Sequence, residues 1–233
     1  MRLDEGVEVV YSPKRFELLR GLRRRSLDIM VSLASRELVS SMHGSVARGD
    51  VNPGSDIDII IPYVVSSHTV ELALSLQGFR SYSRRIAQAT PSHAPKAHIY
   101  LDAEEKECVT FPLISLRTLE LEFYGFGGIL DLPLLKADKR VPGCDKRLML
   151  IQPTELGHIE FSVKGREMEA AKIIGVSLEI VNERVRVLTR RKEVGRTGIV
   201  LSVDVDEGEV FEDVFRRLAS SNPIVKRIIR ARS

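Results

Sequence analysis

The sequence predicts an α/β (α+β) fold, in which a mixed sheet with flanking helices is followed by a small C-terminal domain. The first half of the chain alternates between helical and strand-like spacing of its apolar residues, and the last third returns mainly to helical spacing. The chain has 233 residues, of which 43% are hydrophobic and 29% charged, and it has no low-complexity tract. This composition is that of a globular protein, and the length is comfortable for two domains.

The N-terminal element is predicted to be a long basic helix. Ser12 suits the N-cap and Pro13 the first helical position, and apolar residues then recur at helical spacing to about Leu38. Residues 38–42 are expected to form a short strand that ends at Gly44. A loop rich in Gly, Asn and Pro follows this strand.

The next elements complete the predicted sheet. Residues 56–61 are expected to form a strand that Pro62 closes, since proline cannot donate to a sheet ladder. Residues 68–77 follow as a helix. Three further strands are expected over residues 79–87, 96–102 and 107–113, the last two as a hairpin.

A change of pattern near the middle of the chain indicates a domain boundary. Residues 115–123 have helical spacing and lead into a cluster of glycines, whereas residues 131–153 hold three prolines and are predicted to be irregular. The predicted segments are a first domain with the basic helix and the sheet (1–125), a connecting region (126–160) and a C-terminal domain (161–233).

The C-terminal segment has the spacing of a helix-turn-helix. Helical patterns over residues 165–174 and 177–190 flank Gly175, and Ser177 suits the N-cap of the second helix. A strand pair is expected over residues 196–205, followed by a short amphipathic helix.

With these elements the C-terminal segment resembles the winged-helix and sigma-type families. The resemblance implies a wing whose tip is Gly195-Arg196-Thr197-Gly198, with Lys192 and Arg196 placed for phosphates. It also implies contact with nucleic acid. A helical lid over the first domain is the alternative.

Positive charge is clustered along the chain. The net charge is only +3, but Lys and Arg gather in residues 14–25 and again in residues 226–232. Such clusters attract phosphate and so suggest a nucleic acid or a nucleotide as partner. A solvated helix face is the alternative interpretation.

The sequence also excludes some classes of protein. No apolar run approaches the roughly 20 residues of a membrane span, and residues 1–5 lack the features of a signal peptide, so we expect a cytoplasmic protein with no membrane partner. Cys108 and Cys144 are expected as free buried thiols, with a single bridge as the alternative. The absence of any CxxC or Cys/His cluster gives no indication of zinc.

The Gly44-Ser45 pair predicts a binding turn for phosphate. Glycine has no Cβ, so a strand that ends in Gly-Ser lets the backbone approach a ligand closely. The serine hydroxyl and the amides that follow can bond phosphate oxygens. We therefore expect a triphosphate cradle at this turn.

Asp56 and Asp58 predict a site for a hard cation. On a strand the period of two places both carboxylates on one face, while Ile57 and Ile59 point to the other. Two carboxylates this close repel each other unless a cation such as Mg²⁺ lies between them. An isolated pair of this kind would equally suit the solvent face of an edge strand, so the context decides.

Together these residues resemble the signature of the DNA polymerase β-like nucleotidyltransferase superfamily, which includes predicted nucleotidyltransferases of archaea and bacteria. That signature is a hydrophobic residue, Gly-[Gly/Ser], a gap of about ten residues, and then an acidic-hydrophobic-acidic-hydrophobic run. Here Gly44-Ser45 and Asp56-Ile57-Asp58-Ile59 match it. The resemblance is close over about 20 residues and extends, through the order of elements, over roughly residues 28–113.

The resemblance implies transfer of a nucleoside monophosphate from a nucleoside triphosphate (NTP) to an acceptor hydroxyl, with release of pyrophosphate by a two-metal mechanism. The implied cofactor is Mg²⁺, as two ions, with Mn²⁺ as a possible substitute. The acceptor is open, with RNA or another nucleic acid among the candidates. The implied nucleotide-binding residues are Gly44, Ser45, Arg48 and Ser55. The implied catalytic and metal-binding residues are Asp56, Asp58 and Asp102.

Asp102 enters this set because the family carries a third carboxylate on a later strand, between hydrophobic residues. Leu101-Asp102-Ala103 fits that setting best, at the end of a predicted strand and in phase with His98 and Tyr100. Three neighbouring acids are alternatives: Glu104, Glu105 and Glu107. If no third carboxylate is positioned, nucleotide binding would persist while turnover fails.

A second hypothesis belongs to a different class of function. The chain would be a regulatory protein that binds nucleic acid through its helix-turn-helix and retains only a catalytically weak nucleotidyltransferase fold. Label transfer from an NTP separates the two hypotheses, because only the enzyme performs it.

Overall fold

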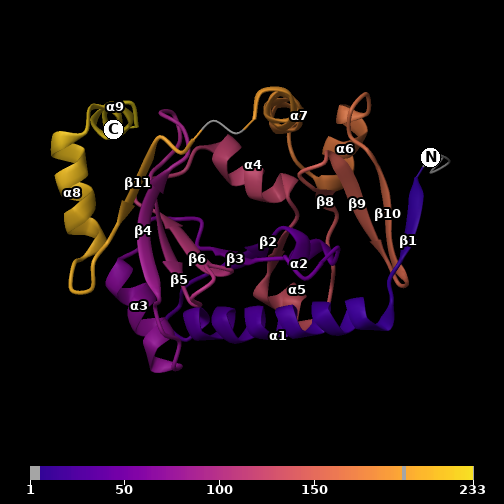
Figure 1. Cartoon of the computed structure of the whole chain (residues 1–233), viewed down its shortest axis with the longest axis horizontal. Helices are drawn as coiled ribbons and strands as arrows, with labels where there is room; N and C mark the ends of the chain where they lie inside the picture. The colour runs from indigo at the N-terminus through magenta and orange to yellow at the C-terminus, as the bar shows by residue number, and fades with distance from the viewer. Residues whose placement is uncertain (1–5, 196–197, 233) are drawn as a thin grey trace. The chain divides into compact units, whose positions relative to one another are not determined.

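The computed structural model describes residues 6–195 and 198–232, which form two compact units (Figure 1). Unit 1 consists of Met1–Leu27, Met42–Ile57 and Thr118–Thr197, and unit 2 of Asp28–Ser41, Asp58–Arg117 and Gly198–Ser233. Each unit draws on three separated stretches of chain, and the division into the segments 1–125, 126–160 and 161–233 stays a prediction.

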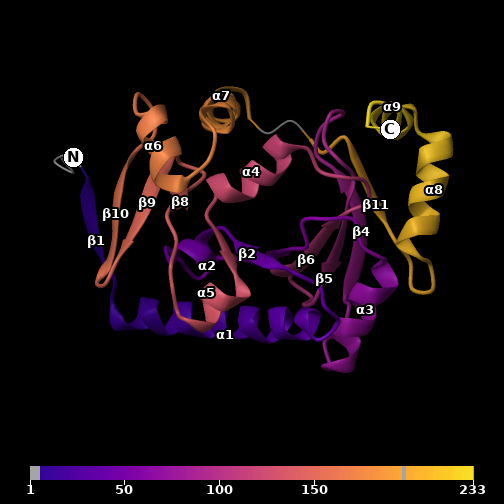
Figure 2. The ribbon, with the colours of Figure 1, turned by 180° about the vertical axis from the view of Figure 1, so that it is seen from behind.

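Unit 1 contains a four-stranded antiparallel sheet. In spatial order its strands are β1 (Val7–Val10), β10 (Gly157–Ser162), β9 (Met149–Thr154) and β8 (Gly143–Cys144). β1 comes from the start of the chain and lies beside β10, with Val7 opposite Glu160 (Figure 2). β9 and β10 form a hairpin in which Gly157 pairs with Thr154.

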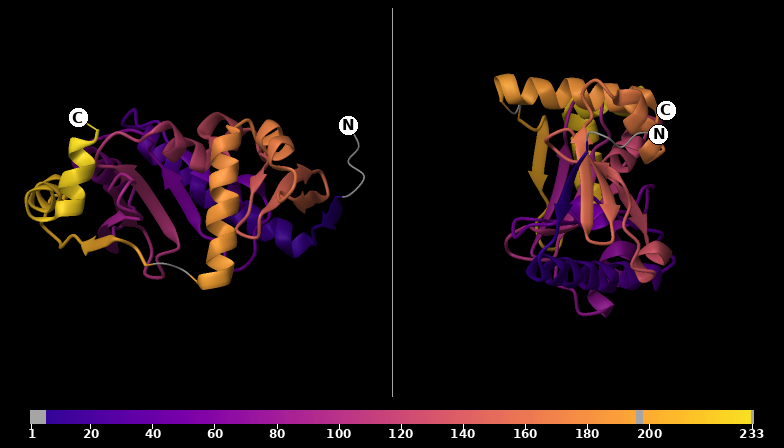
Figure 3. Two further views of the ribbon diagram at one scale, coloured as in Figure 1. Left: turned by 90° about the horizontal axis from the view of Figure 1, so that it is seen from above. Right: turned by 90° about the vertical axis from the view of Figure 1, so that its right-hand side faces the viewer.

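Three helices of unit 1 share a hydrophobic core with this sheet. They are α4 (Thr118–Phe126), α6 (Glu167–Ile174) and α7 (Leu178–Val194), the last seen along its length in Figure 3. The core includes Leu150 and Phe161 from the sheet and Ala170, Ile180 and Leu188 from α6 and α7. The two helices predicted over residues 165–174 and 177–190 are therefore confirmed, because their apolar stripes lie on the buried side.

The predicted irregular stretch 131–153 is wrong in part. It holds the end of β7 (Ile129–Asp131), then α5 (Leu132–Lys136) and β8, and the start of β9. These elements are two to six residues long, too short for periodicity to reveal them. Pro153 also misled the prediction, because it lies inside β9 opposite His158 rather than at the end of a strand.

The long N-terminal helix is present as α1 (Pro13–Ala34), and Arg23 on it is a structural residue. Only 5% of Arg23 is exposed, and its guanidinium donates hydrogen bonds to the carbonyl oxygens of Val46 and Lys139, at 3.2 Å and 2.5 Å. It also forms an ion pair with Asp138 at 3.2 Å. The basic cluster at residues 14–25 is therefore not uniformly a solvated face.

Unit 2 is a sheet covered by helices. Its strands lie in the order β11 (Leu201–Asp204), β4 (Ser83–Gln88), β5 (Lys96–Tyr100), β6 (Glu107–Pro112) and β3 (Ile57–Ile60), of which Ile57 is counted with unit 1. Its further helices are α3 (Ser67–Leu76), α8 (Phe211–Ser221) and α9 (Pro223–Arg230). The fully buried side chains include Ile86, Ile99, Phe111 and Phe211. The ring of Phe211 from α8 packs edge-on against Phe111 of β6, so this helix closes the core.

The predicted fold class, α/β with a mixed sheet and flanking helices, is confirmed. The strand pair expected over residues 196–205 differs from what forms. β11 pairs antiparallel with β4, Leu201 opposite Gln88, and so continues the sheet of unit 2. Arg196 and Thr197, at the tip of the predicted wing, lie outside the described residues, and the winged-helix character of this segment stays a prediction. Among the described residues, no helix has the length and apolar character needed to cross a membrane.

Candidate active site

The Gly44-Ser45 turn links β2 (Ser41–His43) to the short helix α2 (Ser45–Arg48). Gly44 has φ 84° and ψ −150°, a backbone conformation that residues with a Cβ rarely adopt. A Cβ built on Gly44 would meet no atom within 4 Å, and the Gly44 amide donates to the Gly128 carbonyl at 3.0 Å. The turn is thus held from one side and open on the other, as a ligand-binding backbone requires.

A hydrogen bond ties this turn to the loop that precedes the aspartates. The Ser45 hydroxyl donates to the Ser55 hydroxyl oxygen at 3.1 Å, and the same Ser55 oxygen accepts from the Asn52 amide at 3.0 Å. The Ser55 amide in turn donates to the Asn52 carbonyl at 2.9 Å. Residues 52–55 therefore form a closed turn whose position is coupled to Ser45.

Arg48, predicted to bind nucleotide, is occupied inside unit 1. Only 5% of it is exposed, and its guanidinium forms two hydrogen bonds with the Asp50 carboxylate, at 2.9 Å and 3.0 Å. It also donates to the carbonyl oxygens of Gly127 and Cys144, at 2.5 Å and 3.3 Å. These bonds give Arg48 a structural role, and its predicted contact with nucleotide stays a prediction.

The two aspartates of the motif lie at the start of β3. Asp56 is exposed and directly precedes the strand, and Asp58, its second residue, is half-buried. Ile57 and Ile59 are buried, with 2% and 0% of their surface exposed. This alternation is the one that the sequence predicts, because the buried isoleucines fix which way the strand faces.

Asp58 lies on a polar face of the unit 2 sheet that sequence reasoning missed. β6 lies next to β3 in the sheet, and the Ile61 amide donates to the Thr110 carbonyl at 2.9 Å. Burial raises the pKa of the Cys108 thiol to about 12, and the negative charge of Asp58 contributes to the increase.

His98 lies next to Cys108 on this face. Its Nδ1 is 3.0 Å from the Thr110 hydroxyl and 3.7 Å from the Cys108 sulfur. Burial lowers the pKa of His98 to about 4, and the charges of Lys96 and Arg85 lower it further, so the imidazole is neutral near pH 7. The period of two already placed His98 in phase with Tyr100 in the sequence, whereas its position beside Thr110 and Cys108 depends on the register of β5 with β6.

Asp102, the predicted third carboxylate, closes the turn between β5 and β6. Its Oδ1 accepts hydrogen bonds from the amides of Lys106 and Glu107, each at 2.8 Å. Glu105 is one of the three alternative candidates for the third carboxylate. It forms a bidentate pair with Arg85 at 2.9 Å and 3.1 Å, which lowers the pKa of Glu105. A catalytic role of Asp102 stays a prediction.

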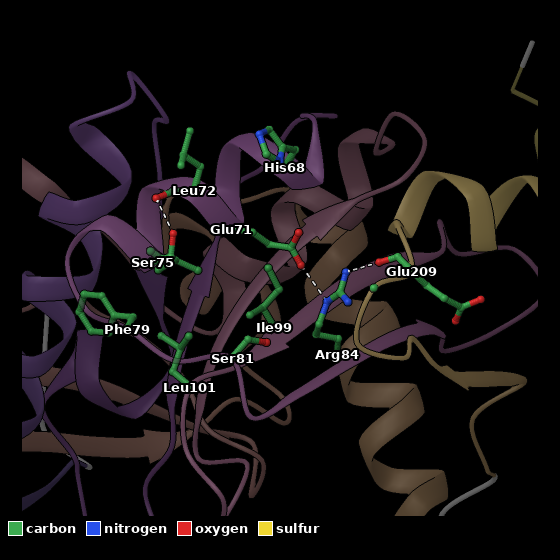
Figure 4. Close-up of a pocket in the computed structure, with 12 residues that line it drawn as sticks. His68, Glu71, Leu72, Ser75, Phe79, Ser81, Arg84, Ile99, Leu101 and Glu209 are labelled. Atoms are coloured by element: carbon green, nitrogen blue, oxygen red, sulfur yellow. Dashed lines mark hydrogen bonds and ion pairs between the residues drawn. The ribbon is translucent and has the colours of Figure 1, made fainter.

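Unit 2 also has a cavity of about 370 Å³ on the other side of its sheet, away from the His98 face. Arg84 and Glu71 point toward each other across it and form an ion pair at 2.8 Å (Figure 4). The Arg84 guanidinium also donates to the carbonyl oxygens of Asp206 and Glu209, at 2.9 Å and 2.7 Å. Burial raises the pKa of Glu71 although Arg84 opposes the increase. The charges in this cavity are balanced by each other, so it offers little to an anionic substrate.

A tight turn at Gly175 joins the helices α6 and α7 at the end of unit 1, and the helix-turn-helix character of this pair stays a prediction. Gly175, between α6 and α7, is left-handed with φ 79°, and the Ser177 hydroxyl accepts from the Ile180 amide at 3.3 Å as an N-cap. Ser177 also donates to Glu122 of α4, through its amide at 3.2 Å and through its hydroxyl. These contacts attach α7 to α4 of the same unit and do not distinguish a nucleic-acid reader from a lid.

The described residues include carboxylates that could bind a metal ion, but they do not form a complete set of ligands around one. Among residues 6–195 and 198–232, no three His, Cys, Asp or Glu side chains are close enough to hold a metal ion together. Asp56 and Asp58 alone supply two hard oxygen donors. That donor set fits Mg²⁺, which usually binds through one or two carboxylates and completes its shell with water and substrate phosphates.

Comparison with known proteins matches the segment that carries this site to a protein family. Residues 23–111 match the model of a family described as "Nucleotidyltransferase domain", which belongs to the polymerase β-like group. The matched residues include the Gly44-Ser45 turn and both Asp56 and Asp58, and the match supports nucleotidyl transfer as the general activity. No curated protein matches the chain.

Proposed function

We propose that this chain, with its nucleotidyltransferase domain at residues 23–111, transfers a nucleoside monophosphate from an NTP to an acceptor hydroxyl and releases pyrophosphate. The observation that carries the proposal is the open turn at Gly44, coupled through Ser45 and Ser55 to the segment that leads into Asp56. A phosphate chain needs close access to backbone amides, and a triphosphate needs a cation nearby. The motif offers both within 15 residues of chain, from Gly44 to Asp58.

In this proposal each residue of the motif has a distinct role. Ser45 binds triphosphate oxygens through its backbone amide, and Gly44, which has no Cβ, leaves room for them to approach. Ser55 accepts from the Ser45 hydroxyl and so holds the turn in place. Asp56 and Asp58 hold Mg²⁺ through their carboxylates. When bound, Mg²⁺ neutralises charge on the phosphates and favours the deprotonated acceptor hydroxyl. The acceptor hydroxyl would give up its proton to a base, for which Asp102 is the predicted carboxylate, and its oxygen would form a bond to the α-phosphorus as the bond to the pyrophosphate oxygen breaks.

Two sequence predictions stay within the proposal as points to test. Asp102 is the predicted third carboxylate, on which deprotonation of the acceptor would depend. A second metal ion is proposed on the same basis. We also propose a cytoplasmic location, where NTPs and Mg²⁺ are present and where buried free thiols such as Cys108 and Cys144 remain reduced.

The test is label transfer from each of the four α-labelled NTPs, with Mg²⁺ and cellular RNA or cell extract as the source of acceptor. We expect transfer by the wild type and its loss in Asp56→Asn and Asp58→Asn. Asp28→Asn, a change of the same kind on the exposed side of α1, is the matched control and should transfer normally. Asp102→Asn separates the roles further, since a catalytic carboxylate is required for transfer but not for NTP binding.

If the wild type transfers nothing, yet binds nucleic acid as well as the two aspartate variants do, the enzyme proposal fails. The second hypothesis, a regulator that binds nucleic acid, would then account for the α6–α7 turn at Gly175.

A further inference from the structure

Unit 1 contains a cleft of about 640 Å³, the size of a small-molecule site, that the proposed mechanism does not use. One wall is the first turns of α1, a second is the loop at residues 50–53, and a third comes from residues 145–158 around the β9–β10 hairpin. The lining side chains with polar or charged groups include Lys14, Arg15, Asn52, Asp145, Arg147 and His158.

Lys14 has fewer polar contacts than the other charged groups of this cleft. Asp50 accepts two hydrogen bonds from Arg48, and Asp145 accepts from Arg147 and from the amides of Arg147 and Met149. Arg147 also pairs with Glu160 at 2.5 Å. By contrast, in the described part of the chain the side chain of Lys14 has no ion-pair or hydrogen-bond partner.

Arg15 is pre-positioned in the same cleft. Its Nε donates to the Val51 carbonyl at 2.9 Å, and its guanidinium stacks 4.0 Å above the Tyr11 ring. These two contacts fix the plane of the guanidinium and leave its terminal nitrogens for another acceptor. A fixed Arg beside an unpaired Lys is an arrangement suited to a phosphate group.

His158 adds a buried donor. Only 2% of this residue is exposed, and its Nδ1 lies 2.6 Å from the Tyr11 hydroxyl. Burial raises the pKa of Tyr11 to about 12 and lowers the pKa of His158, so a protonated phenol faces a neutral imidazole. If the phenol donates to Nδ1, the proton of the ring is on Nε2.

The Nε2 of His158 has no hydrogen-bond partner among the described residues. Oε2 of Glu160, which accepts from Arg147, lies 3.5 Å from it at the limit of a hydrogen bond, and Glu160 raises the pKa of His158 against the larger lowering by burial. A buried donor without an acceptor is costly, and a ligand oxygen would remove that cost.

The cleft is joined to the proposed active-site turn by a short chain of bonds. Asn52 lines the cleft, its amide donates to the Ser55 hydroxyl oxygen, and that oxygen accepts from the Ser45 hydroxyl. An occupant of the cleft would therefore contact the loop that positions Ser45. An acceptor bound in the cleft would thus lie against the loop that leads to Asp56.

We propose that this cleft binds a phosphate ester of the acceptor through Lys14, Arg15 and His158, so that the acceptor is a phosphorylated molecule. This inference rests on the proposed function and names the chemical class of its second substrate. A nucleic-acid strand and a small phosphate ester share this chemistry, and they differ in whether more than one phosphate contributes to binding.

The test measures binding without NTP or Mg²⁺, so that it is independent of the transfer activity. The full chain is titrated with inorganic phosphate, with adenosine 5′-monophosphate and with a short single-stranded oligoribonucleotide. Affinity is followed by calorimetry, and the ring nitrogens of His158 by NMR, with the His158 signals assigned by comparison with His158→Gln. We expect each ligand that binds to shift the His158 signals, and Lys14→Gln to weaken its binding roughly five- to tenfold.

Lys164→Gln is the matched control, since Lys164 is an exposed lysine of the same unit outside the cleft. Tighter and more salt-dependent binding of the oligoribonucleotide than of the monophosphate would identify a strand as the acceptor, and equal affinity would identify a small ester. The proposal is overturned if none of the three ligands shifts the His158 signals, or if Lys14→Gln and Lys164→Gln bind alike. Failure of transfer by the wild type would instead count against the proposed function.

Discussion

The hydroxyl of Ser45 donates a hydrogen bond to the hydroxyl of Ser55 across a distance of 3.1 Å. The two serines are ten residues apart, one at the start of α2 and one directly before Asp56. This bond couples the turn that we propose for phosphate to the segment that we propose for metal. The spacing between the two halves of the motif is therefore a structural requirement as well as a sequence pattern.

Ser55→Ala is expected to weaken NTP binding while leaving the fold intact. The change removes the acceptor of the Ser45 hydroxyl and of the Asn52 amide, both near the surface, at a cost of about 1 kcal/mol. We expect KM for NTP to rise roughly fivefold with little change in thermal stability. Ser162→Ala, at an exposed position of β10, is the control. An unchanged KM would show that the bond does not position Ser45 for the substrate.

Gly44→Ala and Gly165→Ala compare the turn at Gly44 with a second glycine that also has a positive φ. Both glycines have positive φ, 84° and 81°, and an added Cβ at either would meet nothing within 4 Å. Both variants should thus lose stability, by about 1–3 kcal/mol for Gly44→Ala, whose ψ of −150° belongs to a region that essentially only glycine populates. Only Gly44→Ala should also lose NTP binding, as measured by calorimetry with Mg²⁺. Equal binding by the two variants would contradict the proposed contact with phosphate.

Arg48→Ala is expected to lower the free energy of unfolding by roughly 3 kcal/mol, because it leaves the carboxylate of Asp50 without its partner and removes bonds to two carbonyls. Chemical denaturation measures this loss. Arg20→Ala, at an exposed position of α1, should change stability by less than about 0.5 kcal/mol. A stable Arg48→Ala protein with weakened NTP binding would instead support the role predicted from sequence.

His98 is expected to make stability depend on pH. Its pKa is about 4 in the folded chain and near 6.5 when unperturbed, so between these values the unfolded chain binds a proton that the folded chain does not. The contribution of the neutral His98 to the free energy of unfolding is fully present above about pH 6.5 and is lost as pH falls toward 4. A plot of the free energy of unfolding against pH over this range should be flatter for His98→Gln than for the wild type. Parallel plots for the two proteins would show that His98 titrates normally.

Local signals in the sequence were sufficient for the long elements. Ser12-Pro13 marked the start of α1 within one residue, and the pattern after Ser177 gave α7 with its N-cap. The cap chemistry and the apolar stripe of a helix are both properties of neighbouring residues, so they can be recognised without the rest of the chain. Cys108 and Cys144 are free and buried in the structure, as predicted from the reducing compartment that we expect for this chain.

By itself, the sequence determined the fold class, the Gly44-Ser45 turn and the alternation that places Asp58 opposite buried isoleucines. Only the tertiary structure decided which partners each charged side chain has and how deeply it is buried. Arg48 is bonded to carbonyl oxygens 79 and 96 residues away, and His98 is neutral because of the strands that bury it. Hydrogen bonds and desolvation depend on distances between residues remote in sequence, and spacing along the chain does not contain them.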